Sequence, residues 1–264
     1  MRLVSFDALR VWDIPGVKHV KPEAWAQELG TIRAADWLLF PEYWQIGVLA
    51  YGLHKRIFPS LSSYHLGYSK VEMTYAFQAV VPEHTPITRI LFRSDSVVDT
   101  ILGEFSFPFV AKEVRNSEGR GVFLIENRRE LADYVAGNAV LYVQEWLPID
   151  RDVRVVVVGE DVVAAYWRIA APGNFHNNVA RGGEISFAEV PAEVVTLVQR
   201  VARELDINYA GFDVAMVDDH PYLLEFNMRF GNEALRALGI RPGPMIAAYL
   251  QQYSLNLPNI PLAA

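Results

Sequence analysis

Strand-like and helix-like patterns of hydrophobic residues alternate along the whole chain. Two long strand patterns, at Asp152–Val158 and Val162–Ile169, are separated by Gly159-Glu160-Asp161, which predicts a hairpin. Ala192–Leu205 instead places its apolar residues at helical spacing on one face. A second hairpin is predicted over Tyr209–Asn227. This alternation of strands and helices predicts an α/β (α+β) fold.

The remaining elements are shorter. They are predicted in the same way, from short apolar runs for strands and from helical spacing of apolar residues for helices. Strands are expected at Leu3–Phe6, Trp37–Phe40, Thr88–Phe92, Phe109–Val114, Val122–Glu126 and Val140–Trp146. Helices are expected at Tyr43–Arg56, at Lys70–Ala79, after Ser96, after Asn127 and around Met245–Tyr253. The two prolines within Val81–Pro86 predict a linker at that point.

The composition narrows the classes of function. The 264 residues are 52% hydrophobic and include 24 Lys and Arg against 31 Asp and Glu, a formal net charge of −7. This acidic balance argues against binding to nucleic acid or to an anionic membrane. The chain has no cysteine, which excludes disulfides, thiol nucleophiles and cysteine-ligated metals. Early charges at the amino terminus and the lack of an apolar run of about 18 residues predict neither a signal peptide nor a membrane span, so a cytoplasmic protein is expected.

Asp213, Glu225 and Asn227 are the strongest candidates for chemistry. If the turn at Asp218–His220 holds an odd number of residues, Asp213 faces Glu225 across the hairpin, and Leu223 and Asn227 share that face. Two carboxylates and an amide oxygen on a largely apolar face suit Mg²⁺ or Mn²⁺. A solvated hairpin edge, or a salt bridge from a carboxylate to an arginine, is the alternative.

Lys112 lies on the predicted strand Phe109–Val114, on the same face as two valines, and the glycine-bearing loop Arg115–Gly121 follows it. The buried stem of such a lysine would aim its ammonium group at a ligand. The loop is neither a Walker A sequence nor a dinucleotide fingerprint, but its backbone N–H groups could close over phosphates. An ordinary hairpin turn is the alternative.

Two further segments suit nucleotide or anion binding. The strand end Tyr142–Leu147 can offer backbone groups to an adenine edge while an apolar side chain covers the ring, although an ordinary strand end has the same pattern. Arg154, Arg168 and Arg181 lie close together in the sequence, with an asparagine-rich loop between the last two. Guanidinium groups bind phosphate or carboxylate through paired hydrogen bonds, and a solvated loop is the alternative.

Taken in order, these motifs resemble the ATP-grasp superfamily, and within it the RimK-type glutamate ligases and the glutathione-synthetase-like carboxylate–amine ligases. The resemblance runs from about Lys70 to Leu238 and is most specific at Gln144–Trp146, Arg151–Arg154, Asn174–Gly183 and the second hairpin. It implies an ATP-grasp fold with a short N-terminal pre-ATP-grasp α/β unit (1–69). ATP would be clamped between two α+β subdomains. The small one (70–145) carries a glycine-rich lid, and the large one (146–264) carries the metal site.

The resemblance also implies a role for each matching residue. ATP would be held by Lys70, Lys112, Ser117, Gly119, Gly121, Gln144, Glu145, Trp146, Leu147, Asp152, His176, Asn177 and Asn178. Catalysis and substrate binding around the γ-phosphate would use Arg154, Arg168, Asn178, Arg181 and Arg229. Mg²⁺ or Mn²⁺ would be bound by Asp213, Glu225 and Asn227. For Arg229, neutralisation of Glu233 four residues on is the alternative.

The implied activity is ATP-dependent ligation of a carboxylate to an amine through an acyl phosphate, with release of ADP and phosphate. The substrates would be small molecules or peptides; nucleic acid and membrane are not expected as partners, and a homodimer is one option. Two alternatives stay open. One is a nucleotide-binding sensor or scaffold module, and the other is a phosphotransferase that stops after phosphorylating a small molecule.

Overall fold

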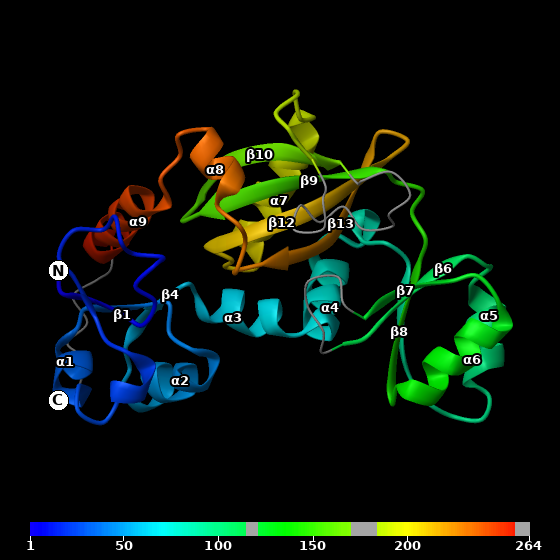
Figure 1. Ribbon diagram of the computed structural model, residues 1–264, viewed down its shortest axis with the longest axis horizontal. Helices are drawn as coiled ribbons and strands as arrows, with labels where there is room; N and C mark the ends of the chain where they lie inside the picture. The colour runs from blue at the N-terminus through cyan, green and yellow to red at the C-terminus, as the bar shows by residue number, and fades with distance from the viewer. Residues whose placement is uncertain (115–120, 170–183, 257–264) are drawn as a thin grey trace.

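The computed structural model describes residues 1–114, 121–169 and 184–256. The strands of these residues form three sheets. Figure 1 shows the N-terminal sheet at one end of the molecule, a five-stranded sheet in the middle and a four-stranded sheet at the other end. This mixed architecture confirms the predicted fold class.

The N-terminal unit is built on a small parallel sheet with the order β2-β1-β3-β4. Its strands are three residues long: β1 (Leu3–Ser5), β2 (Val17–His19), β3 (Trp37–Leu39) and β4 (Arg56–Phe58). Helices α1 (Leu29–Ala34) and α2 (Tyr43–Gly47) belong to this unit, and α2 continues into a π-helical segment over Val48–Gly52. The helix expected over Tyr43–Arg56 is therefore too long, because the chain must turn at Leu53 to enter β4.

The four-stranded antiparallel sheet has the order β5-β8-β6-β7. Its strands are β5 (Thr88–Phe92), β6 (Phe109–Lys112), β7 (Val122–Ile125) and β8 (Val140–Glu145). Helices α5 (Val97–Glu104) and α6 (Arg128–Gly137) pack against it. Asn127 caps α6 as the sequence suggests, since its side chain accepts a hydrogen bond from the backbone N–H of Glu130.

The central sheet has the order β11-β10-β9-β12-β13 and is antiparallel throughout. Its strands are β9 (Arg151–Val158), β10 (Asp161–Ile169), β11 (Glu184–Ser186), β12 (Tyr209–Val217) and β13 (His220–Asn227). One face is covered by α7 (Ala192–Glu204) and α4 (Lys70–Val80), whose apolar side chains join Val153, Val155 and Val157 of β9 in one core. Helix α4, which the sequence-based division groups with the four-stranded sheet, thus packs in the core of the central one.

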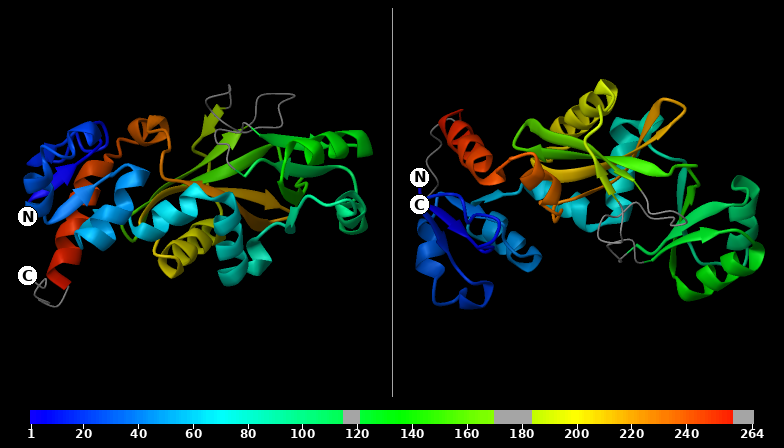
Figure 2. Two further views of the ribbon diagram at one scale, coloured as in Figure 1. Left: turned by 90° about the horizontal axis from the view of Figure 1, so that it is seen from below. Right: turned by 45° about the horizontal axis from the view of Figure 1, so that its top comes forward.

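The opposite face of the central sheet is divided between an apolar end and a charged end. The apolar end packs against the N-terminal unit and against α8 (Glu233–Ala237) and α9 (Pro242–Asn256). Figure 2 shows α9 beside the N-terminal sheet, where the indole N–H of Trp37 donates to the hydroxyl of Ser254 at 2.9 Å. The charged end faces the four-stranded sheet and carries the candidate site.

Helix α3 (Leu61–Tyr68) joins the N-terminal unit to α4 and runs below the central sheet (Figure 1). The hydroxyl of Ser60 accepts a hydrogen bond from the backbone N–H of Ser63 and so caps this helix. The backbone N–H of Ser60 donates to the side chain of Asn208 at 2.8 Å. The start of α3, which connects the N-terminal unit to α4, is therefore hydrogen-bonded to the residue that precedes β12.

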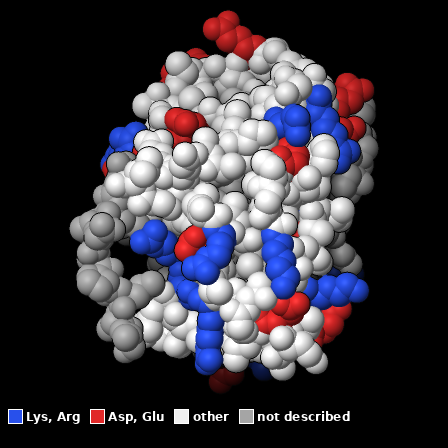
Figure 3. Space-filling model, turned by 90° about the vertical axis from the view of Figure 1, so that its left-hand side faces the viewer, with Lys and Arg blue, Asp and Glu red and all other residues white. Residues whose placement is uncertain are grey.

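Figure 3 shows Lys and Arg side chains gathering on the lower half of the left-hand end of the molecule, which the N-terminal unit forms. Several bases of this unit are paired with acids: Lys18 lies 2.7 Å from Glu28, and Arg2 lies 3.8 Å from Asp36. In the part of the chain that the structure describes, no helix is both long and apolar enough to span a membrane.

Candidate active site

A row of charged side chains crosses the central sheet on the face away from α7. Arg154 on β9 pairs in register with Asp213 on β12, and Asp213 pairs with Glu225 on β13. On the other side, Asp152 of β9 pairs with Arg168 of β10. Because alternate residues of a strand share a face, these strands bring acids and bases together in one cluster.

The two arginines bind both aspartates. The Nε of Arg154 donates to Asp213 at 2.5 Å. Arg168 donates to both oxygens of Asp152 at 2.7 Å and forms an ion pair with Asp213 at 2.9 Å. All four side chains are at most one tenth exposed. Such a network is stable only while every member is present, because a buried charge without its partner is strongly destabilising.

Burial and pairing act in opposite directions on the acidity of this cluster. Burial raises the pKa of Asp152, although Arg168 opposes the shift. Burial alone would lower the pKa of Arg168, but Asp213 and Asp152 outweigh it and raise that pKa. The alternative of a salt bridge to an arginine is therefore present at Asp213. For Arg154 and Arg168, the alternative of a solvated loop is wrong, because both are buried on strands.

Gly211 makes room for Arg154. A Cβ atom at this position would lie 2.7 Å from a guanidinium nitrogen of Arg154 and 2.9 Å from its Cδ. Gly211 pairs with Asn227 on β13 and stands two residues before Asp213 on the same face. Sequence reasoning did not single out this glycine, although a glycine two residues before a candidate ligand on a strand is a usable signal of close approach.

Asp213 pairs with Glu225 as predicted, but the turn and the strand register that produce this pairing differ from the prediction. The turn holds two residues, Asp218 and Asp219, both with positive φ, and not three. A bulge then leaves Leu224 unpaired, because Val214 pairs with Leu223 whereas Asp213 pairs with Glu225. The expectation that Leu223 shares the face of Glu225 is wrong, since Leu223 packs in the core beneath α7.

Glu225 and Asn227 point to the same face and contact each other, with the amide nitrogen of Asn227 donating to Glu225 at 2.9 Å. Both oxygens of Asp213 already accept from guanidinium groups. No cluster of three or more His, Cys, Asp or Glu able to hold a metal occurs within residues 1–114, 121–169 and 184–256. Two carboxylates and an amide nevertheless form an oxygen donor set that fits Mg²⁺ when phosphate oxygens complete the shell.

A small pocket opens beside Glu225, between the central and four-stranded sheets. It is lined by Lys70, Met73, Thr74, Lys112, Tyr142, Leu224 and Glu225. The ammonium of Lys112 lies 5.3 Å from the centre of the Tyr142 ring. Burial lowers the pKa of Lys70, Glu225 opposes this shift, and Lys112 adds to it. Two lysines and one carboxylate thus share this pocket, and the phosphate role of both lysines stays a prediction.

Hydrogen bonds fix the floor of this lysine pocket. The hydroxyls of Thr74 and Tyr142 lie 2.8 Å apart, and the amide of Gln144 donates to Thr88 at 2.9 Å and to Tyr142 at 3.3 Å. Sequence reasoning missed Thr74 and gave the side chain of Tyr142 no role. A hydroxyl group within the otherwise apolar stretches that form α4 and β8 could have pointed to both residues.

The segment predicted to bind adenine offers fewer free side chains than its sequence suggests. The amide of Gln144 is buried in the network just described, and Glu145 accepts a hydrogen bond from the backbone N–H of Ile87 at 2.6 Å. Trp146 remains 39% exposed. Adenine recognition at Gln144–Leu147 stays a prediction, and it would depend on backbone groups and on Trp146.

Arg229 lies apart from the lysine pocket, in the segment after β13. Its guanidinium forms an ion pair with Glu42 of the N-terminal unit at 3.2 Å. Arg229 thus pairs with Glu42, whereas the sequence offered Glu233 as its alternative partner.

The remaining predicted site residues lie in or beside residues 115–120 and 170–183, which are not among the described residues. Gly121 opens the stretch that leads into β7. Several predicted residues lie outside the described residues, so their roles stay predictions: Ser117, Gly119, His176, Asn177, Asn178 and Arg181.

Comparison with solved structures defines the class of protein. A RimK domain ATP-grasp protein from Sphaerobacter thermophilus has a TM-score of 0.72 over 94% of this chain and 99% of its own, at 17% identity. D-alanine–D-alanine ligase from Bacillus anthracis complexed with ATP also has a TM-score of 0.72, over 97% and 100% of the two chains, at 14% identity. The fold is therefore the ATP-grasp fold.

Within this class, residues 75–250 match the RimK-like ATP-grasp domain, and the chain belongs to that family. A ribosomal protein bS6–L-glutamate ligase from Shigella boydii is 31% identical over 176 residues, which cover 64% of this chain and 59% of that protein. A probable alpha-L-glutamate ligase from Hahella chejuensis is 31% identical over 176 residues, covering 64% and 58%. The chain thus spans less than two thirds of the length of these curated relatives.

Proposed function

We propose that this protein is an ATP-dependent carboxylate–amine ligase that works through an acyl phosphate. The observation that carries the proposal is the pairing of Asp213 with Glu225 beside a pocket that holds Lys70 and Lys112. Membership of the RimK-like ATP-grasp family supports it. We further propose glutamate-like small substrates, as the names of the relatives suggest. The three-part division at residues 69 and 145 and a cytoplasmic location are proposals from the sequence.

Each group in the site has a task in such a reaction. The lysines hold the phosphates of ATP, and their positive charge favours approach of a carboxylate oxygen to the γ-phosphorus. Transfer forms the carboxylate–phosphate bond and breaks the bond to ADP. The amine then attacks the acyl carbon and expels phosphate, and the nitrogen loses a proton. Mg²⁺ bound at Glu225, Asn227 and Asp213 would neutralise phosphate charge.

The buried arginines act by holding the carboxylates in place. Arg154 and Arg168 bind the oxygens of Asp213, so its orientation does not depend on the metal. Glu225 carries no such bond to a guanidinium among the described contacts; it accepts a hydrogen bond from the amide of Asn227 and interacts with the charge of Lys70. We therefore propose Glu225 as the ligand whose charge is exposed to the metal, and Asp213 as a preorganised second ligand.

A phosphate-release screen tests this function. The protein is incubated with Mg-ATP and with pairs of amino acids, peptides and small acids, and phosphate and amide product are both measured. Ligation requires phosphate release that depends on a matched pair, with Glu225→Gln inactive and the exposed control Glu233→Gln active. ADP together with a stable phosphorylated acid would identify a phosphotransferase, and ATP binding without turnover would identify a sensor module.

A further inference from the structure

Tyr142 lies where the two halves of the lysine pocket meet. It belongs to β8 of the four-stranded sheet and pairs in register with Lys112 on β6. Thr74, which also lines the pocket, belongs to α4, and the side chains of Tyr142 and Thr74 are both buried. A buried phenol normally has a hydrogen-bond partner for its hydroxyl. The partners of Tyr142 therefore indicate which parts of the pocket this side chain joins.

The aromatic ring of Tyr142 has a cation as its neighbour. The ammonium of Lys112 lies 5.3 Å from the centre of this ring. A cation over an aromatic face is attracted to it, most strongly where water is excluded. The backbone of both residues is held as well, because the hydroxyl of Tyr134 on α6 donates to the carbonyl of Lys112 at 2.7 Å and accepts from the N–H of Tyr142 at 3.0 Å. The ring and the ammonium are thus held together through side chain and backbone.

The hydroxyl of Tyr142 connects to the other half of the pocket. It lies 2.8 Å from the hydroxyl of Thr74 and accepts from the amide of Gln144 at 3.3 Å. Because an amide nitrogen can only donate, the phenol proton is free to point at the oxygen of Thr74. Thr74 comes one helical turn after Lys70, on the same face of α4. One side chain therefore contacts Lys112 and reaches the helix that carries Lys70.

Helix α4 is anchored to the central sheet. Met73, the residue before Thr74, lies in the core of that sheet. Its sulfur accepts a hydrogen bond from the backbone N–H of Phe226 on β13 at 3.3 Å. Phe226 lies between two of the candidate metal ligands in the sequence. The contact between Thr74 and Tyr142 thus joins the central sheet to the four-stranded sheet at the lysine pocket.

Two ammonium groups in one pocket repel each other, so contacts with the protein must keep them together before a polyanion binds. We propose that Tyr142 is a positioning residue for ATP. Its ring holds the ammonium of Lys112, and its hydroxyl holds α4, which carries Lys70, through Thr74. Both lysines then face the phosphates at a fixed separation, which lowers the ordering cost of binding. The inference rests on the phosphate role of the lysines in the proposed function.

Calorimetric titration of the full chain tests the inference without turnover. The probes are the β,γ-methylene analogue of ATP with Mg²⁺, and adenosine, which lacks the phosphates. Tyr142→Phe removes the hydroxyl and keeps the ring, Thr74→Val removes the other hydroxyl at nearly constant shape, and Tyr142→Leu removes the ring as well. Tyr249→Phe on α9 and Thr196→Val on α7 are the controls, because each loses one hydrogen-bonded hydroxyl and neither residue lines the lysine pocket.

We expect Tyr142→Phe and Thr74→Val each to bind the analogue about threefold to tenfold more weakly, the effect of one hydrogen bond, with adenosine within twofold of the parent. The double variant should bind no more weakly than the weaker of the two single variants, because both hydroxyls serve one contact. In a Lys112→Met background, Tyr142→Leu should have no larger effect than Tyr142→Phe, since the ring then has no ammonium to hold. The Phe and Val variants keep the size of the side chain, so they fold even if Tyr142→Leu does not.

Unchanged affinity for the analogue in both hydroxyl variants would overturn the inference. Equal losses for the analogue and for adenosine would overturn it too, because they would show a structural role without any action on the phosphates. If Lys112→Met weakens the analogue and the hydroxyl variants do not, the proposed function stays intact. If Lys112→Met has no effect, or the parent does not bind the analogue, the phosphate role in the proposed function is wrong and the inference fails with it.

Discussion

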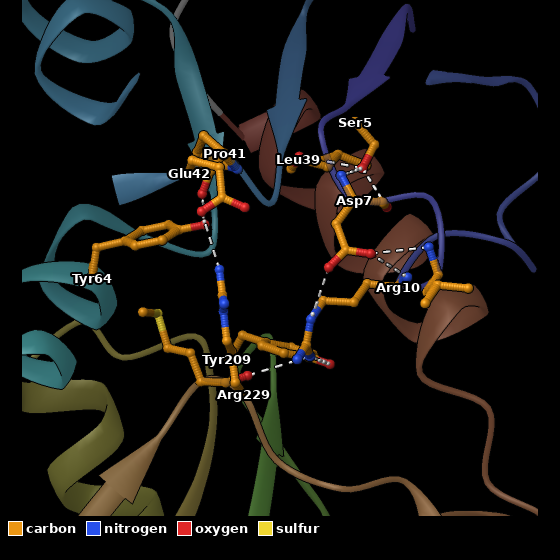
Figure 4. Close-up of polar contacts among 11 residues, drawn as sticks. Ser5, Asp7, Arg10, Leu39, Pro41, Glu42, Tyr64, Tyr209 and Arg229 are labelled. Carbon is orange, nitrogen blue, oxygen red and sulfur yellow. Dashed lines mark hydrogen bonds and ion pairs between the residues drawn. The ribbon is translucent and has the colours of Figure 1, made fainter. Parts of the chain in front are cut away.

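The lysine pocket and the two ion pairs of Asp7 with Arg10 and of Glu42 with Arg229, which lie at the carboxyl ends of β1 and β3 (Figure 4), are built in different ways. The lysine pocket takes its side chains from α4 and from antiparallel strands. It combines two lysines with one carboxylate. The two ion pairs take their charges from the segments after β1, β3 and β13, and each cation there already has an acid as its partner. The first arrangement carries a net positive charge, which suits a polyanion such as ATP, whereas the second carries none.

The buried network of Asp213, Arg154 and Arg168 lies beside Glu225 on the same face of the central sheet. Asp213→Asn should therefore have the largest effect of any change discussed. We expect loss of ATP turnover together with destabilisation of about 3–5 kcal/mol, because two buried arginines lose their shared partner. Urea unfolding and a phosphate-release assay measure the two effects. A stable variant without activity would show that the network does not depend on Asp213.

Glu225→Gln should separate activity from stability. We expect about 100-fold to 1000-fold lower turnover, the magnitude typical of losing one charge-stabilising group at a reaction centre. The midpoint of urea unfolding should stay close to that of the parent, since Glu225 accepts one hydrogen bond, from Asn227, and its interaction with Lys70 is across a pocket open to water. Glu233→Gln is the matched control. Full activity in Glu225→Gln would exclude this carboxylate as a metal ligand.

The hairpin also shows how far the sequence can predict a site. Alternation along β12 and β13 correctly predicts that Asp213 faces Glu225, because two independent errors cancel: the turn is one residue shorter than expected, and a bulge at Leu224 adds one. Alternation has no signal for a bulge, which depends on side chains packing under the sheet. For the same reason Leu223 was assigned to the wrong face.

The N-terminal unit was the least predictable region. Strands β2 and β4 were missed although β1 and β3, which have the same length of three residues, were predicted. The difference is that β1 and β3 are buried throughout and lie in apolar runs, whereas β2 and β4 include exposed charged or polar residues. The pair of Glu42 with Arg229 joins positions 187 residues apart, and its geometry depends on how the N-terminal unit packs on α8 and α9. The long strands and helix α7 were predicted well because their patterns extend over eight or more residues.

Lys112→Met tests the difference between the two regions directly. Removing the ammonium while keeping an unbranched side chain should raise KM for ATP about tenfold to 100-fold, because each charge-assisted bond to phosphate contributes about 1.5–3 kcal/mol. KM for the acid should change less than threefold. Equal losses for both substrates would mean that Lys112 does not act on ATP alone.

Gly211→Ala tests whether Arg154 must lie against the backbone of β12. A Cβ atom would stand 2.7 Å from its guanidinium, so the side chain has to move away from Asp213. We expect destabilisation of about 1–3 kcal/mol, as for other overpacked interiors. Gly103→Ala on α5 is the control, since nothing lies within 4 Å of the added atom there. If the two variants unfold alike, the close approach has no energetic consequence.

The smallest expected effect concerns the free energy of unfolding that the ion pair of Arg229 with Glu42 contributes. A double-mutant cycle with Arg229→Met and Glu42→Gln should give a coupling free energy of unfolding below about 1 kcal/mol, because the pair is largely exposed and screened by water. The buried pair of Arg168 with Asp152 should give a coupling several times larger. Unfolding in urea measures both cycles. A strong coupling at Glu42 would show that this pair fastens the N-terminal unit to the central sheet. A weak one would show that this pair contributes little to the packing of the N-terminal unit on the central sheet.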